Sequence, residues 1–202
     1  MNLYIHFCSF GFCNCYVLGL DKQALIIDPG SMERAILNSI EENDYTLAGV
    51  LITHNHPNHV HGLSTLKRIY DVDIYSQSPA IYDYKTILIR NGETLRIGPF
   101  KIEIISVPGH SVDSAVFKTD RMLFTGDVMT AGLVGSTSSI YGSVNQMTAL
   151  RTSILSLPGD YSVFPGHGPV TSLDAERRFN AGINAYEDYK TRRYRFRPEL
   201  DF

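Results

Sequence analysis

The chain has 202 residues, of which 44% are hydrophobic and 19% are charged, so it is long and apolar enough to bury a sizeable core. Its net charge of −3 argues against a surface that coats nucleic acid. Residues 1–7 contain neither a basic stretch nor a long apolar run, so we expect no signal peptide and no membrane-spanning segment.

The length predicts a single domain over residues 1–202, and no low-complexity stretch or linker divides the chain. Three cysteines, an odd number, fit reduced thiols better than a disulfide framework, which indicates a cytoplasmic protein. Cys13 and Cys15 fall on one face of a predicted strand, which leaves a thiol site open. The favoured interpretation is that both are ordinary buried cysteines.

The first half of the chain alternates short strands with helices. Strands are predicted at residues 2–7, 12–19, 23–28 and 48–52, separated by turns that contain glycine. Helices are predicted at residues 32–42 and 62–70, and Ser31 is the expected N-cap of the first helix.

The second half repeats this organisation. Phe100, Ile102 and Ile104 alternate with charged residues, which predicts a half-buried strand. Further strands are predicted at residues 114–118, 121–125 and 161–164, and helices at 146–156 and 173–189. Runs of strands closed by helices predict an α+β fold in which two sheets pack face to face with helices outside. Polar clusters fall at the strand ends, where open sheets place their sites.

Four of the seven histidines lie between residues 54 and 61, directly after an apolar segment. His54 and His56 are two residues apart, so an extended segment points both side chains the same way. His59 lies one turn further on and can face the same point from the start of the next helix. Imidazole is the commonest metal ligand, and packing hardly explains this density of histidine. His61 is more simply a surface residue at a helix start.

Three more potential ligands follow predicted strands, each beside glycine: His110, Asp127 and His167. Glycine and proline let the backbone turn sharply and approach a site closely. Histidines together with a carboxylate suit zinc, iron or manganese, and exclude a calcium cage built from oxygen atoms.

On these motifs the chain resembles the metallo-β-lactamase superfamily, and within it the short glyoxalase II-like hydrolases. The resemblance runs from Asn14-Cys15-Tyr16 to the Pro-Gly-His-Gly that contains His167. Five motifs appear in the family's order: Asp28, the histidine run, His110, Asp127 and His167. The fold that this implies is an αββα sandwich of two mixed β-sheets with helices on the outer faces.

The resemblance also implies a set of metal ligands. His54, His56 and His110 would hold a first metal, and Asp127 would bridge to a second metal held with His59 and His167. Asp28 would support the site through hydrogen bonds rather than bind metal. Other interpretations stay open: His59 and His167 could remain as hydrogen-bonding residues of a lost second site, and Asp28 could be a turn residue.

Asn58 departs from the family, which carries an aspartate at this position of the motif. The amide keeps the shape of the carboxylate but not its charge, and it offers a donor where an acceptor is wanted. We therefore expect the second metal to bind more weakly and hydrolysis to be slower. Asp127 and Asn58 are the residues that we expect to act on the reacting groups.

The implied activity is metal-dependent hydrolysis of a small acyl substrate, most simply a thiolester as in hydroxyacylglutathione hydrolases, with a metal-bound hydroxide as nucleophile. One or two zinc ions per chain are expected, with iron or manganese as alternatives. Because of Asn58, two other functions stay open: a mononuclear iron enzyme like the persulfide dioxygenases, and a non-catalytic metal-binding protein. A lactonase also fits. We expect a small-molecule substrate and neither nucleic acid nor membrane as partner, and the sequence does not predict an oligomeric state.

Two features limit what can be said of the substrate. The chain is too short for the C-terminal helical domain of longer glyoxalase II enzymes. The stretch Gly135-Ser136-Thr137-Ser138 also lacks the Arg and Asp of the Gly-Arg-x-Asp element that many short relatives carry. Five basic residues lie between Lys190 and Arg197, for which a solvated segment is favoured over an anion site.

Overall fold

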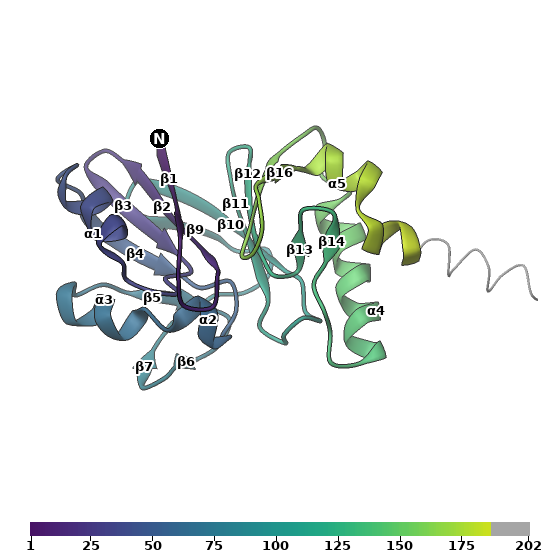
Figure 1. Cartoon of the computed structure of the whole chain (residues 1–202), viewed down its shortest axis with the longest axis horizontal. Coiled ribbons are helices and arrows are strands. Elements are labelled where there is room, and N and C mark those ends of the chain that lie inside the picture. Colours follow the sequence, from purple (N-terminus) through teal and green to yellow (C-terminus); the bar gives the residue numbers. More distant parts are fainter. Residues whose placement is uncertain (187–202) are drawn as a thin grey trace, which may run out of the picture.

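The computed structural model describes residues 1–186 and has four layers. Helices α1 and α3 cover one sheet, helices α4 and α5 cover a second sheet, and the two sheets face each other in the middle (Figure 1). The predicted αββα sandwich is therefore confirmed. The predicted basic stretch from Lys190 to Arg197 lies outside the described residues.

The first sheet is mixed, with antiparallel pairing at one edge and parallel pairing in the remainder. Its order is β1 (Asn2–Phe7), β2 (Asn14–Leu20), β3 (Gln23–Ile27), β4 (Thr46–Leu51), β5 (Ile74–Ser76) and β8 (Ile87–Leu88). The helices of this half are α1 (Arg34–Glu41), α2 (Pro57–Val60) and α3 (Leu63–Ile69). A small hairpin joins β6 (Ala80–Ile81) and β7 (Tyr84–Lys85).

The second sheet is antiparallel except where β12 pairs with β15. Its order is β16 (Thr171–Ser172), β15 (Ser162–Pro165), β12 (Met122–Gly126), β11 (Ala115–Thr119), β10 (Phe100–Ser106) and β9 (Thr94–Ile97). The helices are α4 (Ile140–Ala149), continued by a π-helical turn (Leu150–Ile154), and α5 (Leu173–Phe179). A second small hairpin joins β13 (Met129–Thr130) and β14 (Leu133–Val134).

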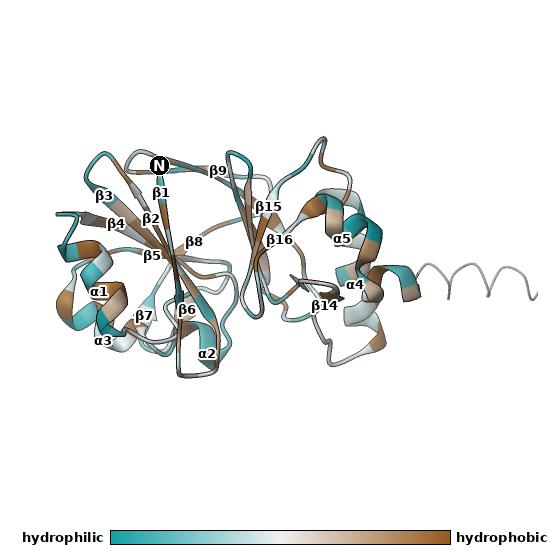
Figure 2. Ribbon diagram, turned by 45° about the horizontal axis from the view of Figure 1, so that its top comes forward, coloured by the Kyte–Doolittle hydropathy of each residue, from teal (hydrophilic) through white to brown (hydrophobic). Residues whose placement is uncertain are grey.

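Alternating side chains of the strands separate the core into layers. On β2, Cys15 and Val17 pack toward α1 and α3, whereas Tyr16 and Leu18 pack between the sheets. The second sheet follows the same rule, since Leu123 of β12 packs toward α4 in a separate cluster. This follows from the two-residue period of a strand, which sends neighbouring side chains to opposite faces. Figure 2 shows the matching brown and teal stripes on the outer helices.

The start of α1 differs from the prediction. The helix begins at Arg34 with Glu33 at the N-cap position, and no side chain caps it. The Ser31 hydroxyl instead donates a hydrogen bond to the Glu33 carboxylate over 3.1 Å. The predicted cap was wrong because the Glu33 carboxylate, two residues away, takes the hydroxyl. That carboxylate also accepts a hydrogen bond from the backbone N–H of Ser9 on the β1–β2 hairpin.

The two C-terminal helices also differ from their predicted bounds. The helix predicted at 146–156 begins at Ile140, where the Ser139 hydroxyl accepts a hydrogen bond from the N–H of Gly142. The helix predicted at 173–189 breaks at Asn180, and a second helical stretch covers 181–186. The break is stabilised because the Asn180 side chain accepts from the N–H groups of Gly182 and Ile183 and donates to Glu176.

Among residues 1–186, no helix is long and apolar enough to cross a membrane. The three cysteines Cys8, Cys13 and Cys15 are all buried and free of disulfides, as the favoured interpretation predicted.

Candidate metal centre

The predicted ligands come from the ends of four strands. His54 and His56 follow β4, and His59 lies in the short helix α2. His110 follows β10 and Asp127 follows β12 directly. His167 follows β15, which runs parallel to β12. The sheet edges therefore bring together residues that are more than one hundred positions apart in the sequence.

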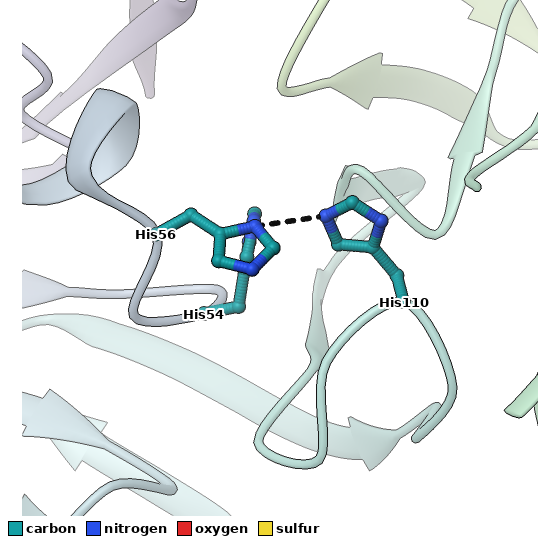
Figure 3. A group of neighbouring side chains, drawn as sticks. All are labelled: His54, His56 and His110. Carbon is teal, nitrogen blue, oxygen red and sulfur yellow. Dashed lines mark hydrogen bonds between the residues drawn. The ribbon is translucent and has the colours of Figure 1, made fainter. Parts of the chain in front are cut away.

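Three histidines form the first cluster. The ligand atoms of His54, His56 and His110 all lie within 4.8 Å of one another. Nε2 of His110 lies 3.0 Å from Nδ1 of His56, and Figure 3 shows the rings turned toward one another from opposite loops. His54 is 1% exposed, so the cluster is buried on one side and open on the other.

Two of these rings are oriented by hydrogen bonds on Nδ1, the ring nitrogen that faces away from the cluster. Nδ1 of His54 donates over 3.1 Å to the Thr53 hydroxyl, which itself donates over 2.6 Å to Asp28. Nδ1 of His110 donates over 2.8 Å to the Ser136 carbonyl. With Nδ1 protonated, Nε2 of each ring keeps its lone pair for a metal.

Asp127 joins this cluster to a second one. Its Oδ2 atom lies 3.9 Å from Nε2 of His54, 3.3 Å from Nε2 of His59 and 3.7 Å from Nε2 of His110. His54, His59 and Asp127 form a second set whose ligand atoms lie within 4.8 Å of one another. On the other side, Nδ1 of His59 donates to Asp28 over 3.0 Å. Asp28 therefore acts on His59 directly and on His54 through Thr53.

His167 and Asn58 lie together beyond Asp127. Nδ1 of His167 donates over 2.7 Å to Oδ1 of Asp127. Its Nε2 lies 3.0 Å from Nδ2 of Asn58 and 3.1 Å from the Gly11 carbonyl. A neutral ring accepts from the Asn58 amide, whereas a protonated ring donates to Gly11. Within residues 1–186, His167 joins neither metal-capable set.

Gly166 allows this close packing. A Cβ at this position would lie 2.4 Å from Oδ1 of Asp127 and 2.5 Å from Cε1 of His59. Any larger residue would push β15 away from both side chains. The predicted role of the glycine beside His167 is thus confirmed.

His54 and His56 of the first cluster are neutral at neutral pH. Burial lowers the pKa of His54 to about 2. Burial, followed by the neighbouring ring of His110, also lowers the pKa of His56. Both rings therefore present lone pairs without first losing a proton.

The second cluster is charged. Burial alone would lower the pKa of His59, but the carboxylates of Asp28 and Asp127 outweigh it and raise that pKa to about 10. The hydrogen bond to Asp127 likewise raises the pKa of His167. Burial opposes ionisation of Asp127, yet its hydrogen bond with His167 and the charged ring of His59, 3.3 Å away, hold its pKa well below the usual range.

The donor set fits a divalent metal. Nε2 of His54 and Nε2 of His59 are buried and have no hydrogen-bond partner, which is rare for buried polar atoms. A cation between these nitrogens and Asp127 would satisfy both. Imidazole nitrogens with one carboxylate suit zinc, iron or manganese rather than calcium.

Comparisons with known proteins agree with this geometry. The family model described as "Metallo-beta-lactamase superfamily" matches residues 8–85. The chain is 30% identical to the "Probable polyketide biosynthesis zinc-dependent hydrolase BaeB" of Bacillus velezensis, over 76% of this chain and 72% of the relative. The chain belongs to the metallo-β-lactamase superfamily.

Two further proteins are similar to this chain over nearly their whole length. The "Hydroxyacylglutathione hydrolase GloC" of Haemophilus influenzae is 29% identical over 85% of this chain and 93% of the relative. The crystal structure of ETHE1 from Myxococcus xanthus superposes with a TM-score of 0.83 at 25% identity, over 98% of this chain and 93% of that chain. Membership places this chain among metal-binding metallohydrolases.

Three residues at the centre were missed from the sequence: Thr53, Ser136 and Gly11. Thr53 offers a signal, since a hydroxyl directly before the first histidine can link it to an acid. Ser136 and Gly11 act through their carbonyl groups, which every residue type possesses. His61 was correctly predicted to be exposed, and it stacks on Phe10 at a centroid distance of 4.0 Å.

Replacing Asp28 by asparagine should lower both the stability of the fold and the affinity of the second cluster for a metal ion. Asp28 accepts from the Thr53 N–H, the Thr53 hydroxyl and His59, and an amide can accept on one side only. We expect the free energy of unfolding to fall by about 1–3 kcal/mol. Affinity for a second metal ion should fall about 10–100-fold. Chemical denaturation and metal titration measure the two effects.

Asp120→Asn is the matched control for this variant. Asp120 is exposed and also has a positive φ of 47°, compared with 52° for Asp28. Equal losses of stability in the two variants would assign the effect to backbone conformation instead of the hydrogen bonds.

Proposed function

We propose that this chain is a metal-dependent hydrolase whose substrate is a small thiolester. One observation carries the proposal: Nε2 of His54, Nδ1 of His56 and Nε2 of His110 lie close together. Hydrogen bonds on Nδ1 of His54 and Nδ1 of His110 orient two of these rings toward the same point. The relative named hydroxyacylglutathione hydrolase supports a thiolester as the bond that is cleaved.

The first proposed ligand set is the first cluster, and the second takes His59 and Asp127 of the second cluster together with the neighbouring His167. His54, His56 and His110 would hold the first ion, with Asp127 beside it. His59, Asp127 and His167 would hold a second ion next to Asn58. Zinc is the metal that we propose, and iron and manganese suit the same donors. A divalent ion held there would polarise the substrate carbonyl and lower the pKa of a water molecule.

The residues of the chain would orient the reacting groups. Oδ2 of Asp127 faces the space between His54, His59 and His110, and its low pKa keeps it ionised. An ionised carboxylate accepts a hydrogen bond from water and aligns its lone pair, but it is a weak base. A thiolate leaves without being protonated more readily than an amine or alkoxide, because thiol pKa values are about 8.5. This arrangement therefore favours a thiolester over an amide.

Asn58 makes the two ion sites unequal. Its amide carries no charge, and its Nδ2 lies 3.0 Å from His167. The three histidines of the first cluster already bring their ligand atoms within 4.8 Å of one another without Asn58. We therefore propose one tightly held ion and a weaker second one. This inequality also supports a second candidate, a mononuclear iron enzyme that oxidises a persulfide.

Binding of the second ion should depend more steeply on pH than binding of the first. His59, with its pKa of about 10, holds a proton at neutral pH that a second ion must displace, whereas His54 and His56 hold none. Raising the pH toward 10 should thus strengthen second-ion binding more steeply than first-ion binding. Calorimetric titration with Co²⁺ between pH 6 and 8.5 measures this. Parallel pH dependence for both ions would contradict it.

The test of function combines metal content with turnover. Protein purified without added metal is analysed by element, then assayed on lactoyl and acetyl thiolesters before and after chelation. We expect about one ion per chain and thiolester hydrolysis that chelation abolishes and zinc restores. Bound iron with oxygen uptake on a persulfide, and no hydrolysis, would select the second candidate. Bound metal with neither activity would indicate a non-catalytic protein.

We also propose that residues 1–202 form one domain that acts on small molecules. The three buried free thiols fit a reducing compartment such as the cytoplasm.

A further inference from the structure

Two loops from different sheets carry the first cluster. His54 and His56 lie on the segment after β4 of the first sheet, and His110 lies on the segment after β10 of the second sheet (Figure 3). Their ligand atoms lie within 4.8 Å of one another, so a small change in the spacing of the loops would alter the geometry offered to a metal ion. The fold therefore has to fix the spacing of these two loops.

Two hydrogen bonds join the loops on either side of His54. The backbone N–H of Ala115, the first residue of β11, donates to the Thr53 carbonyl over 2.8 Å. The backbone N–H of Asn55 donates over 2.9 Å to Oδ2 of Asp113, which is buried. The first bond joins backbone atoms, which every residue type supplies. The second bond requires an acceptor side chain at position 113.

The Asp113 carboxylate accepts two further hydrogen bonds. The Ser78 hydroxyl, on the segment after β5, donates to Oδ2 over 2.6 Å. The Ser111 hydroxyl, directly after His110, donates to Oδ1 over 2.8 Å. The carboxylate thus joins its own loop, which carries His110, to the loop of Asn55 and to a third segment. A buried polar group whose donors are all satisfied holds such segments rigidly together.

His56 depends on this contact more than the other two ligands do. Nδ1 of His54 and Nδ1 of His110 donate to neighbours that orient their rings. His56 presents Nδ1 to the cluster itself, so that nitrogen is not available to orient its ring in the same way. The backbone at Asn55, directly before His56, therefore has the larger part in placing this ligand.

We propose that Asp113 is a positioning residue that fixes the spacing of the loops of His56 and His110, and thereby the affinity and geometry of the first ion site. It binds neither the ion nor the substrate. This rests on the first ligand set of the proposed function. Asp113 also lines an open cavity with Gln77 and Arg90, so the experiment has to distinguish positioning from direct contact with substrate.

Two variants of Asp113 separate the effect of its hydrogen bonds from that of its charge. Asp113→Ala removes the charge and all three bonds. Asp113→Asn removes the charge alone, because its amide oxygen can accept from Asn55 and Ser78. Its NH2 group can donate to the Ser111 hydroxyl, since a hydroxyl both donates and accepts.

Glu176→Ala is the matched control for loss of a buried carboxylate. Glu176 on α5 is buried and accepts from the N–H of Gly132, the Thr171 hydroxyl and the Asn180 amide. These donors lie outside the two loops of the first cluster. If Asp113 only stabilised the fold, the two alanine variants would behave alike.

The measurements are made with and without metal. In the metal-free protein, hydrogen exchange of the Asn55 backbone amide reports whether the loop is held. With Co²⁺ as the probe ion, titration measures the affinity of the first site, and the visible absorption band reports its coordination geometry. Steady-state kinetics on an acetyl thiolester separate kcat from KM.

We expect Asp113→Ala to speed exchange of the Asn55 amide about tenfold and to weaken first-ion binding about 10–100-fold, with an altered Co²⁺ band. kcat should fall while KM changes little, and Asp113→Asn should retain most of each native property. Glu176→Ala should lose thermal stability but keep Co²⁺ affinity within about twofold, because its bonds lie away from these loops.

Four results would overturn the proposal. Asp113→Ala could leave exchange and Co²⁺ binding unchanged, or Glu176→Ala could lose as much Co²⁺ affinity as Asp113→Ala. An equally large loss in Asp113→Asn would assign the effect to charge, and a change in KM alone would assign Asp113 to substrate contact. If Asp113→Ala does not fold, Ser78→Ala and Ser111→Ala each remove one bond, and native Co²⁺ affinity in both would overturn the proposal.

Failure of the proposed function is distinguishable from failure of this role. If the native chain binds Co²⁺ but cleaves no thiolester, the proposed function fails, and amide exchange with Co²⁺ titration still decides the role of Asp113. Thiolester hydrolysis and Co²⁺ binding that Asp113→Ala leaves intact would overturn the positioning role alone. A native chain that binds no Co²⁺ would overturn both.

Discussion

Replacing His54 by alanine should lower thiolester hydrolysis about 1,000-fold, because it removes a ligand shared by both clusters. Its Nε2 atom is buried without a hydrogen-bond partner, as expected of an atom that a metal ion would engage. Tightly held metal should fall well below one ion per chain. Steady-state kinetics and elemental analysis of the same preparation measure both effects.

Two further variants show whether the loss comes from the ligand or from the fold. His54 is buried, so its removal also leaves a cavity. His110→Ala removes a ligand that is 11% exposed and should give a similar loss of activity with less loss of thermal stability. His6→Ala changes a histidine on β1 that contacts Ser39 and should leave activity intact. Full activity in His54→Ala would contradict the proposed function.

Replacing Asn58 by aspartate should tighten binding of the second ion about 10–100-fold and raise the rate of hydrolysis. The carboxylate would bring a negative charge and a good ligand beside His167, where the native amide lies at 3.0 Å. It would also replace the amide NH2 donor of Asn58 by a carboxylate oxygen, which can accept a hydrogen bond or bind the second ion. Ions retained per chain after dialysis against a mild chelator, together with kcat, measure the change.

Asn55→Asp is the matched control, because it adds the same charge three residues before Asn58, just ahead of α2. Asn55 is exposed. We expect little change in second-ion binding. A similar gain in the two variants would indicate a general effect of charge, and two tightly held ions in the native chain would show that Asn58 leaves the second site unimpaired.

The layered fold could be predicted because its pattern is local. Buried strands such as β3 and β4 appear as short apolar runs, and the alternation at Phe100, Ile102 and Ile104 matches their burial. The ends of helices were less predictable. Ser31 can cap a helix in isolation, but Glu33 takes its hydroxyl while also holding the β1–β2 hairpin.

The residue types of the candidate centre were also recognisable from the chain. The histidine run and the glycine-flanked His110, Asp127 and His167 are enough to predict a metal-binding cluster and the missing charge at Asn58. The sequence allows these predictions because a metal site requires particular side chain types, which are visible in the chain itself.

Only the tertiary structure decides how these residues are held. Asp28 reaches His59 directly and His54 through Thr53, and the Gly11 carbonyl meets His167 from a hairpin far away in the chain. Such contacts depend on distances between segments and often use backbone atoms that all residues share. Residue types thus specify which chemistry is available, and packing of the two sheets specifies how each ring is oriented, protonated and presented to a substrate.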